Sequence, residues 1–347
     1  MHSVEEQFST LPPRLQLGTC RSLRDFQQIA QIGEGTYGRV YKTKDKQSGK
    51  IVALKQVKLE QEMCGIPSTS LREIMILKSL NHPNIVKMND VIVGDRATDI
   101  FIEFEYCEHA LSGILDQLYH PFTESEIKQL MLQLLSALDY IHSRWIIHRD
   151  LKLSNLLYTN DGNLKLADFG MARKFESRVR DYSPRVVTLW FRPPEILLGS
   201  RNYSTPVDIW GAGCIFGELL QRLPLFPGQS EFNQLDLIFQ LLGTPNNTSW
   251  PDFFRHTLSE RFRHLSPNGL DLLSQLLSLD PSQRMTAHDA LHHPYFQENP
   301  LPTPLDQMPK YPSTNIPYRP THKTENQTGL PPPSQRVLEA ISKSTKQ

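Results

Sequence analysis

The chain has 347 residues, of which 39% are hydrophobic and 21% are charged, an ordinary composition for a soluble globular protein. Its 37 basic and 37 acidic side chains cancel, which argues against direct binding to nucleic acid over a broad surface. Four scattered cysteines without a C-x-x-C pair disfavour a zinc site or a disulfide framework and fit the reducing nuclear or cytoplasmic compartments. No membrane-spanning run or secretory signal pattern is present, so no membrane partner is expected.

Residues 1–25 are expected to form an N-terminal tail, with short strands from Phe26 onward. The runs RVYKTKD and IVALKQVKL flank the turn sequence KQSGK, which is typical of antiparallel strands. The stretch TSLREIMILKSL predicts a helix. Helical spacing predicts that its apolar face comprises Leu71, Ile74, Met75, Leu77 and Leu80. Strand character returns in NIVKMNDVIVG and DIFIEFEYC.

After Cys107 the pattern becomes helical. The stretch TESEIKQLMLQLLSALDYIHSRW opens with Thr123 and Glu126 in the spacing of a capping box, and its apolar stripe predicts a buried helix. Four further stretches predict helices: STPVDIWGAGCIFGELLQ, EFNQLDLIFQLLG, NGLDLLSQLLS and TAHDALHHPYF. The fold class is therefore α+β, with a small strand-rich lobe (26–107) before a larger helical lobe (108–296).

The C-terminal stretch, residues 297–347, is dense in proline and polar residues. Such a composition cannot build a core of its own. We expect a flexible tail that packs at most as an extended strap over the domain.

Gly33, Gly35 and Gly38 follow the spacing G-x-G-x-x-G, which lets a backbone approach phosphate closely. The same spacing occurs in dinucleotide-binding folds and in the ATP loop of protein kinases. A dinucleotide fingerprint needs a helix directly after its glycines, whereas a strand pattern follows here. The dinucleotide oxidoreductase is therefore disfavoured.

Further motifs follow the glycines in a fixed order. They are VALK with Lys55, HRDLKLSN with Asp150, Lys152 and Asn155, DFG beginning at Asp168, and PPE. In this order and at these separations they resemble the protein kinase family from about residue 26 to 296. The resemblance implies a bilobal protein-kinase fold and transfer of the γ-phosphoryl group of ATP to protein hydroxyl groups.

The resemblance implies a role for each site residue, with ATP and Mg²⁺ as cofactors. Asp150 would accept the proton of the substrate hydroxyl, with Lys152 beside the γ-phosphate, and Asn155 and Asp168 would hold magnesium. Glu73 on the lone helix of the small lobe would pair with Lys55, which contacts the α- and β-phosphates. The remaining residues of the ATP site would be Ile32, Gly33, Glu34, Gly35, Thr36, Tyr37, Gly38, Arg39, Val40, Ala53, Phe104 (the residue guarding the back of the adenine pocket), Glu105, Cys107 and Leu157.

Some of these positions have plainer interpretations as well. Phe104, Ala53 and Leu157 are core residues and pocket wall at once. Thr36 and Tyr37 are either regulatory phosphorylation sites or simply residues at a strand tip.

Three segments, GEGTYG, GIPSTSLREI and VVTLWFRPPE, resemble the cyclin-dependent kinases. The resemblance implies a role in cell-cycle or transcription control and a cyclin, of the M type, bound to the helix at 65–80. The cyclin would push that helix inward so that Glu73 meets Lys55.

The same family resemblance implies a second switch and a substrate preference. Ser183 stands where the family carries its activating phosphate, which Arg72, Arg149 and Arg173 would receive. Val187 would turn its carbonyl group toward Arg192, leaving the residue after the target serine or threonine without an acceptor for its N–H group. Because proline has no such N–H group, Ser/Thr-Pro specificity is expected.

Several positions depart from the family pattern. Pro193 and Phe191 replace an alanine and a tyrosine, and Ala110 replaces an aspartate that would bind ribose. Glu103 replaces an apolar residue and needs a polar partner or solvent. Two further positions resemble structural residues of the family: Asp208, which would hold the backbone of HRD, and Glu195, which would pair with Arg284.

The main rival function is a pseudokinase scaffold that binds a cyclin without turnover. Pseudokinases usually lack one of the residues Lys55, Asp150, Asn155 and Asp168, whereas all four are present here. An active kinase is therefore the favoured interpretation.

Overall fold

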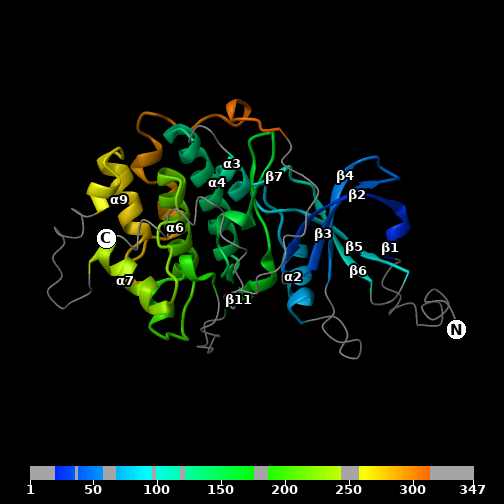
Figure 1. The fold of residues 1–347 in the computed structure, drawn as a ribbon, viewed down its shortest axis with the longest axis horizontal. Coiled ribbons are helices and arrows are strands. Elements are labelled where there is room, and N and C mark those ends of the chain that lie inside the picture. The colour runs from blue at the N-terminus through cyan, green and yellow to red at the C-terminus, as the bar shows by residue number, and fades with distance from the viewer. Residues whose placement is uncertain are drawn as a thin grey trace. The chain divides into compact units, whose positions relative to one another are not determined.

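The structure is a computed structural model that describes residues 20–35, 38–57, 68–95, 99–117, 122–175, 187–243 and 258–312. These residues fall into two compact units (Figure 1). The first holds the described residues up to Ser79 together with Lys87–Cys107, and the second holds Leu80–Val86 and the described residues from Glu108 onward. Strands dominate the first unit and helices the second, which confirms the α+β class.

A six-stranded sheet forms most of the first unit, in the order β1-β5-β6-β4-β3-β2. Its strands are β1 (Arg21–Ser22), β2 (Phe26–Gly35), β3 (Gly38–Asp45), β4 (Ile51–Gln56), β5 (Met88–Val93) and β6 (Ile100–Glu105). The β1–β5 pair is parallel, and the other neighbouring pairs are antiparallel. The meander predicted around the glycines is therefore present.

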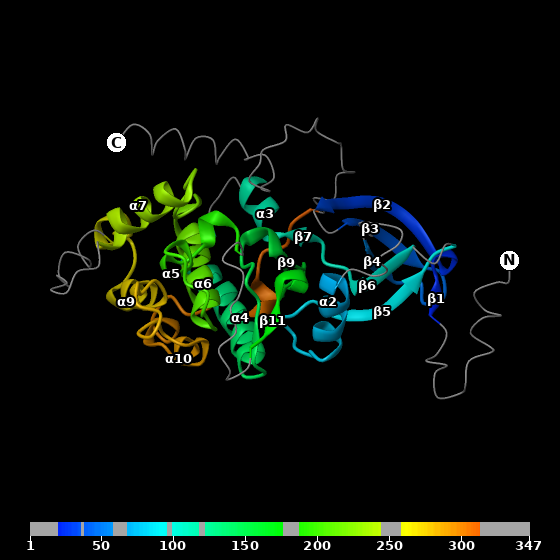
Figure 2. The same ribbon diagram turned by 90° about the horizontal axis from the view of Figure 1, so that it is seen from below.

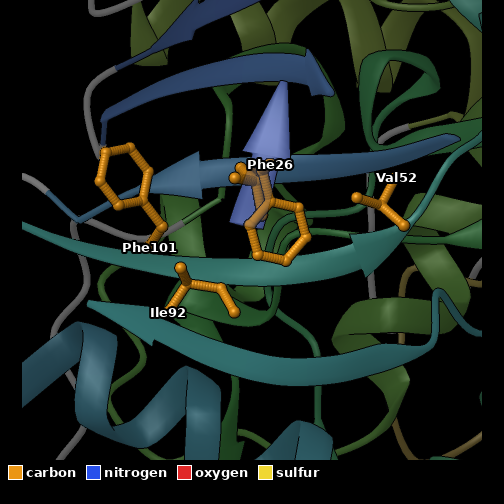
Figure 3. Close-up of a cluster of buried hydrophobic side chains, with 5 residues drawn as sticks. Phe26, Val52, Ile92 and Phe101 are labelled. Carbon is orange, nitrogen blue, oxygen red and sulfur yellow. The ribbon is translucent and has the colours of Figure 1, made fainter. Parts of the chain in front are cut away.

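The two faces of this sheet carry different side chains. One face holds a buried apolar cluster (Figure 3) formed by Phe26, Val52, Leu54, Ile92 and Phe101. Because side chains alternate along a strand, the register places Ala53, Lys55 and Phe104 on the opposite face. The apolar cluster thus fixes the strands whose other face carries the expected ATP-binding residues.

The N-terminal boundary differs from the expectation. Sequence patterns assign residues 21–25 to the tail, whereas Arg21 and Ser22 form β1, with Arg21 opposite Ile92 of β5. A short 3₁₀ turn (Leu23–Asp25) follows, and Leu23 packs against the apolar cluster. A strand of two residues shows no periodicity, so the sequence pattern could not reveal it.

Helix α2 (Ser68–Lys78) is present, but its expected apolar face is only partly right, because Leu77 is buried as expected and two other members are not. Met75 is 72% exposed and Leu71 is 44% exposed, whereas Glu73, Ile76 and Leu77 are buried. The reason is the ion pair between Glu73 and Lys55, which turns an acidic residue toward the sheet. The apolar residues at 71 and 75 are therefore left in solvent.

The second unit is mainly helical. Its helices are α3 (Leu111–Gln117), α4 (Glu124–His142), α5 (Pro194–Leu197), α6 (Pro206–Gln221), α7 (Glu231–Leu242), α9 (Pro267–Leu276) and α10 (Ala287–Leu291). Helices α4 and α6 pack against each other in its interior (Figure 2). The predicted capping box of α4 is confirmed, because Thr123 Oγ1 accepts from the Glu126 N–H group and Glu126 Oε2 accepts from that of Thr123. Within the described part of the chain, no helix is long and apolar enough to cross a membrane.

Two small sheets lie in the second unit beside the loops that carry the sequence motifs. One has the order β10-β9-β7, formed by β7 (His109–Ala110), β9 (Leu156–Tyr158) and β10 (Leu164–Leu166). The other pairs β8 (Ile146–Ile147) with β11 (Arg173–Lys174). Residues 80–86, expected in the small lobe, belong to the second unit because Val86 and Asn84 share backbone hydrogen bonds with Leu166.

As far as it is described, the C-terminal stretch packs as an extended strap, the alternative to a flexible tail that its composition left open. Lys128 Nζ on α4 donates to the carbonyl oxygens of Glu298 (3.0 Å) and Pro300 (2.9 Å). Further along, Tyr158 donates to the Pro309 carbonyl oxygen (2.6 Å), and Asn160 bonds the backbone of Tyr311 at both its N–H and C=O groups. Backbone groups make these contacts, so composition alone did not indicate them.

Candidate active site

The glycine-rich turn joins β2 and β3 in the first unit. Gly33 lies opposite Val40, Glu34 opposite Arg39, and Gly35 opposite Gly38. Gly38 has φ = 142°, a backbone conformation that residues with a side chain rarely adopt. Thr36 and Tyr37 lie outside the described residues, and so does any structural test of them as phosphorylation sites.

Lys55 and Glu73 form a close ion pair within the first unit. Lys55 Nζ lies 2.7 Å from Glu73 Oε1, and the two side chains are 15% and 4% exposed. Lys55 comes from β4 and Glu73 from the inner face of α2, so the strand register and the helix rotation jointly produce the pair. Ala53 and Phe104 lie directly opposite each other on β4 and β6, on the same face as Lys55. The pairing predicted for Glu73 is present.

The loop before β9, in the second unit, gathers several motif side chains around Asp150. Its Oδ2 atom accepts from Lys152 Nζ at 2.8 Å and from Asn155 Nδ2 at 3.0 Å. Its Oδ1 atom accepts from the hydroxyl group of Thr188 at 3.0 Å. Asp150 is 7% exposed, so three donors hold a nearly buried carboxylate in one orientation.

Thr188 is a functional residue that the sequence analysis missed. Its hydroxyl group lies between Asp150 Oδ1 and Lys152 Nζ, at 3.0 and 3.5 Å, although 36 residues separate it from Lys152. The only signal available was its position in VVTLW, directly after Val187. It joins the residues expected to handle the proton and the phosphate.

Asn155 and Asp168 have the chemistry to hold magnesium. Asn155 Nδ2 donates to the carbonyl oxygen of Asp150 (2.7 Å) and to its carboxylate. Because both contacts use the amide nitrogen, the amide oxygen is the atom of Asn155 that would bind the metal ion. The Ala167 N–H group donates to the Asn155 carbonyl oxygen at 2.9 Å, so the residue before Asp168 is tied to the same loop. Carboxylate and amide oxygens are hard ligands of the kind Mg²⁺ takes. The residues present fit the ion.

Backbone strain is concentrated in this region. Arg149, Asp168 and Val187 have φ of 68°, 64° and 66°, a left-handed conformation that costs a residue with a side chain about 1–3 kcal/mol. Hydrogen bonds restrain the backbone beside these positions, including the partly buried bond of His148 Nε2 with the Ala167 carbonyl oxygen at 3.0 Å. Strain at functional positions persists only when the surroundings fix it.

Asp208 at the start of α6 holds the HRD backbone, as its family resemblance implies. Its two carboxylate oxygens accept from the N–H groups of His148 (2.8 Å) and Arg149 (2.9 Å), and Oδ2 also lies 2.9 Å from His142 Nε2. Burial works to raise the pKa of Asp208, but the bond with His142 and neighbouring positive charge hold that pKa below its ordinary value. The carboxylate is therefore charged and fully bonded.

Glu195 and Arg284 form a second buried pair. Arg284 Nη1 and Nη2 lie 2.9 and 3.1 Å from the two carboxylate oxygens of Glu195, and the Arg284 side chain is 0% exposed. A bidentate contact of this kind fixes the orientation of the two groups as well as attracting them. It ties the PPE segment to the body of the second unit.

Val187 and Arg192 have the geometry expected for them. The Val187 carbonyl oxygen accepts from Arg192 Nη2 at 3.0 Å and from Nε at 3.3 Å. Arg192 also pairs with Glu231 at 2.6 Å. Pro193 keeps Arg192 extended, with φ = −78° and ψ = 124°, and this does not prevent its guanidinium group from reaching Val187. The acceptor oxygen of Val187 is thus occupied within the protein.

The other expected site residues are distributed as follows. Leu157 lies on β9 opposite Ala110 of β7. Arg149 donates to the Met171 carbonyl oxygen (2.8 Å) and to the Tyr203 hydroxyl group (3.1 Å). Arg72 lies on α2 and Arg173 on β11. Ser183 lies outside the described residues.

A model of the protein kinase domain matches residues 26–296 of the chain. The chain therefore belongs to the protein kinase family and is an ATP-dependent enzyme. It is 49% identical over 322 residues to a Dictyostelium discoideum protein named probable cyclin-dependent kinase 10, with 88% of each chain covered. It is 47% identical over 322 residues to cyclin-dependent kinase 10 of Homo sapiens, with 89% of each covered.

A third relative, cyclin-dependent kinase G-1 of Oryza sativa subsp. indica, is 47% identical over 317 residues, which make up 85% of this chain and 46% of that one. Within the protein kinases, the chain is thus a cyclin-dependent serine/threonine kinase similar to cyclin-dependent kinase 10. The segments LGTCRSLRDFQQIAQIGEGTYG and YCEHAL predict this likeness, with cyclin-dependent kinase 11 as the nearest competitor.

Proposed function

We propose that the chain, bound to a cyclin of the M type, phosphorylates serine or threonine residues that are followed by proline. The proposed kinase domain comprises residues 26–296. Its predicted lobes, 26–107 and 108–296, differ from the two compact units in the placement of residues 80–86. The observation that carries the proposal is the set of contacts around Asp150, because Lys152, Asn155 and Thr188 orient a carboxylate that can accept a proton.

In the proposed reaction Asp150 accepts the proton of the substrate hydroxyl group as the oxygen attacks phosphorus. Lys152 sits 2.8 Å from Asp150 and supplies positive charge beside the transferred group. Thr188 restrains the rotation of the Asp150 carboxylate. ATP supplies the phosphoryl group, with Mg²⁺ held by Asn155 and Asp168, and Lys55, oriented by Glu73, contacts its phosphates.

The exposed apolar side chains of α2 support binding of a cyclin there. Leu71 and Met75 are 44% and 72% exposed and lie four residues apart, on one side of the helix. Neighbouring exposed apolar side chains of this kind are typical of a surface that contacts another protein. A partner that packs on this side would also hold Glu73 against Lys55, which links cyclin binding to the ATP site.

We expect Met75→Glu to weaken cyclin binding by roughly 10- to 100-fold, since burying a methionine side chain is worth about 1.5–3 kcal/mol. Titration of purified kinase with a labelled cyclin measures this. Phe232→Glu is the matched control, because Phe232 is 88% exposed on α7 of the other unit. Equal cyclin affinity for Met75→Glu and the wild type would contradict docking on α2.

The occupied Val187 carbonyl group supports selection for proline. An N–H group on the residue after the target would be left unsatisfied, at a cost of about 1–3 kcal/mol. We expect kcat/KM for a peptide with proline there to exceed that of its alanine counterpart by roughly 5- to 150-fold. An N-methylalanine peptide, which also lacks the N–H group, should regain much of the rate.

Arg192→Met frees the Val187 carbonyl group and should therefore reduce the discrimination between proline and alanine peptides. Equal kcat/KM values for the two peptides with the wild-type enzyme would disprove the proposed specificity.

We also propose that phosphorylated Ser183 is received by Arg72, Arg149 and Arg173. Phosphoserine brings nearly two negative charges and strong acceptor oxygens, which suit a cluster of arginines. Pro184 follows Ser183, so the site itself fits a proline-directed kinase.

A further inference from the structure

Glu103 is a buried acid in the layer that holds the apolar cluster. It lies on β6 opposite Leu54 of β4 and two residues after Phe101, so its side chain is on the cluster side of the sheet. It is 4% exposed. A carboxylate in such a place needs a counter-charge or hydrogen bonds.

A bulge in β5 and the short strand β1 provide the two partners of Glu103. A register shift in β5 between Met88 and Asp90 leaves Asn89 as an extra residue, and Asn89 Nδ2 donates to Glu103 Oε1 at 3.1 Å. Bulges of this kind redirect a side chain. Glu103 Oε2 has no hydrogen-bond partner within the described residues, and Arg21 Nη1 of β1 lies 3.5 Å from it.

Arg21 joins two acids through one guanidinium group. Its Nη2 atom lies 2.7 Å from Asp45 Oδ1 at the end of β3, and the group also lies over the ring of Phe26, 4.5 Å from its centre. The bond from Arg21 lowers the pKa of Asp45, so Asp45 is charged. Without Arg21, two buried carboxylates would remain in one cluster without this cation.

Burial raises the pKa of Glu103, while Asn89 and Arg21 act in the opposite direction. Asp45 has donors besides Arg21, because the Gln47 N–H group (3.0 Å) and the Ser48 hydroxyl group (2.6 Å) also donate to it. Without Arg21, Asp45 therefore keeps two donors, whereas among the described residues Glu103 keeps the Asn89 donor and its Oε2 atom loses the nearby cation.

Glu103 is adjacent to the residues expected to contact adenine. Phe104 follows it directly and faces the other side of the sheet, opposite Ala53. Glu105 ends β6 and leads to Cys107. A shift of about 1 Å in this backbone is enough to impair positioned groups.

We propose that Arg21 is a positioning residue for ATP binding. Its positive charge compensates the charge of Glu103 and thereby holds strand β6 in register, so that Phe104, Glu105 and Cys107 are placed for their contacts with adenine. This rests on the proposed nucleotide site. Arg21 lies before residue 26, where the kinase-domain match begins. Arg21, from outside the matched domain, thus compensates the charge of Glu103, which stands where the family usually has an apolar residue.

The test is steady-state kinetics of the full chain in complex with its cyclin. Arg21→Met should raise KM for ATP on the order of five- to tenfold, the lower end of couplings between linked sites, and should leave kcat at saturating ATP unchanged. Arg21→Met combined with Glu103→Leu should return KM to within about twofold of wild type, because replacing both partners of a buried pair by apolar groups removes the uncompensated charge.

Arg24→Met is the matched control. Arg24 lies in the same segment as Arg21, and both side chains of its ion pair with Asp95 (2.8 Å) are exposed. KM for ATP should therefore not change in this variant. An unchanged KM in Arg21→Met, or a double variant as impaired as Arg21→Met, would overturn the proposal. If Arg21→Met does not fold, Arg21→Lys is the deciding variant, because lysine lacks the forked guanidinium group that reaches both acids. A raised KM for ATP in Arg21→Lys supports the proposal, and an unchanged KM refutes it.

The direct affinity for ATP with Mg²⁺, measured by calorimetry on the same variants, separates this inference from the proposed function. A wild-type complex that transfers no phosphate would count against the proposed function. Wild-type transfer with equal ATP affinity in Arg21→Met would count against the role of Arg21 alone.

Discussion

Asp150→Asn should lower kcat by roughly 10²- to 10⁴-fold, the usual contribution of a positioned general base. An amide cannot accept the proton of the substrate hydroxyl group at neutral pH. The fold should persist, because the amide oxygen can take the place of Oδ2, which accepts from Lys152 and Asn155. The amide nitrogen can take the place of Oδ1 and donate to Thr188, whose hydroxyl group also accepts hydrogen bonds.

The measurement is phosphate transfer to a Ser-Pro peptide by the cyclin complex, together with the thermal shift caused by ATP and Mg²⁺. The thermal shift should remain close to wild type. Asp161→Asn, an exposed change in the turn before β10, is the matched control and should keep full activity. A kcat for Asp150→Asn within a few-fold of wild type would mean that another group accepts the proton.

Asp208→Ala should lower the free energy of unfolding by about 3–5 kcal/mol, because it removes a buried charged group that accepts several hydrogen bonds. Asp208 is 1% exposed, and its loss leaves the buried N–H groups of His148 and Arg149 without their acceptor. Chemical denaturation followed by circular dichroism measures the difference. Asp236→Ala, an exposed change on α7, should stay within about 0.5 kcal/mol of wild type.

The pH dependence of the Asp208 contribution follows from its lowered pKa in the folded state. A lowered pKa stabilises the fold fully above the unfolded pKa of about 3.9, and the contribution is lost as pH falls toward the folded pKa. The stability difference between wild type and Asp208→Ala should therefore be constant near neutral pH and shrink below about pH 4. A difference that stayed equally large in acid would show that charge on Asp208 is not its source.

Asp150 lies in the segment HRDLKLSN, and Asp208 bonds the backbone of that segment. The order of the motifs in the sequence indicated the role of this segment. Lys152 and Asn155 lie within five residues of Asp150, and the resemblance to protein kinases implied that the three act at one site, where the structure shows them in contact. Val187 and Arg192 are similarly close, and their carbonyl–guanidinium contact was expected from the VVTLW pattern. Local spacing fixes which groups meet when few dihedral angles separate them.

The face of α2 shows where spacing was insufficient. Counting apolar residues favoured Leu71 and Met75, yet both are exposed, and Glu73 is buried. The helix orientation depends on Lys55, which lies on a strand 18 residues earlier and pairs with Glu73. A helix of this sequence has several partly apolar sides. Which side is buried depends on the element against which the helix packs.

Distant partners that no family motif indicated were also beyond prediction. Glu103 was expected to need a polar partner, but nothing in its neighbourhood indicated Arg21 in the N-terminal segment or a bulge at Asn89. For the strap from Glu298 to Tyr311, the proline-rich composition favoured a flexible tail and left an extended strap as the alternative. It is ordered because Lys128, Tyr158 and Asn160 bond its backbone, and composition says nothing about such bonds.

The sequence by itself determined the class of enzyme and the groups expected to perform the chemistry, because motif order and short spacings are properties of the covalent chain. Only the tertiary structure decided which side of α2 faces solvent, how Thr188 joins Asp150, and which cation compensates Glu103. The physical reason is that burial and charge pairing depend on groups that the chain brings together only when the whole domain is folded.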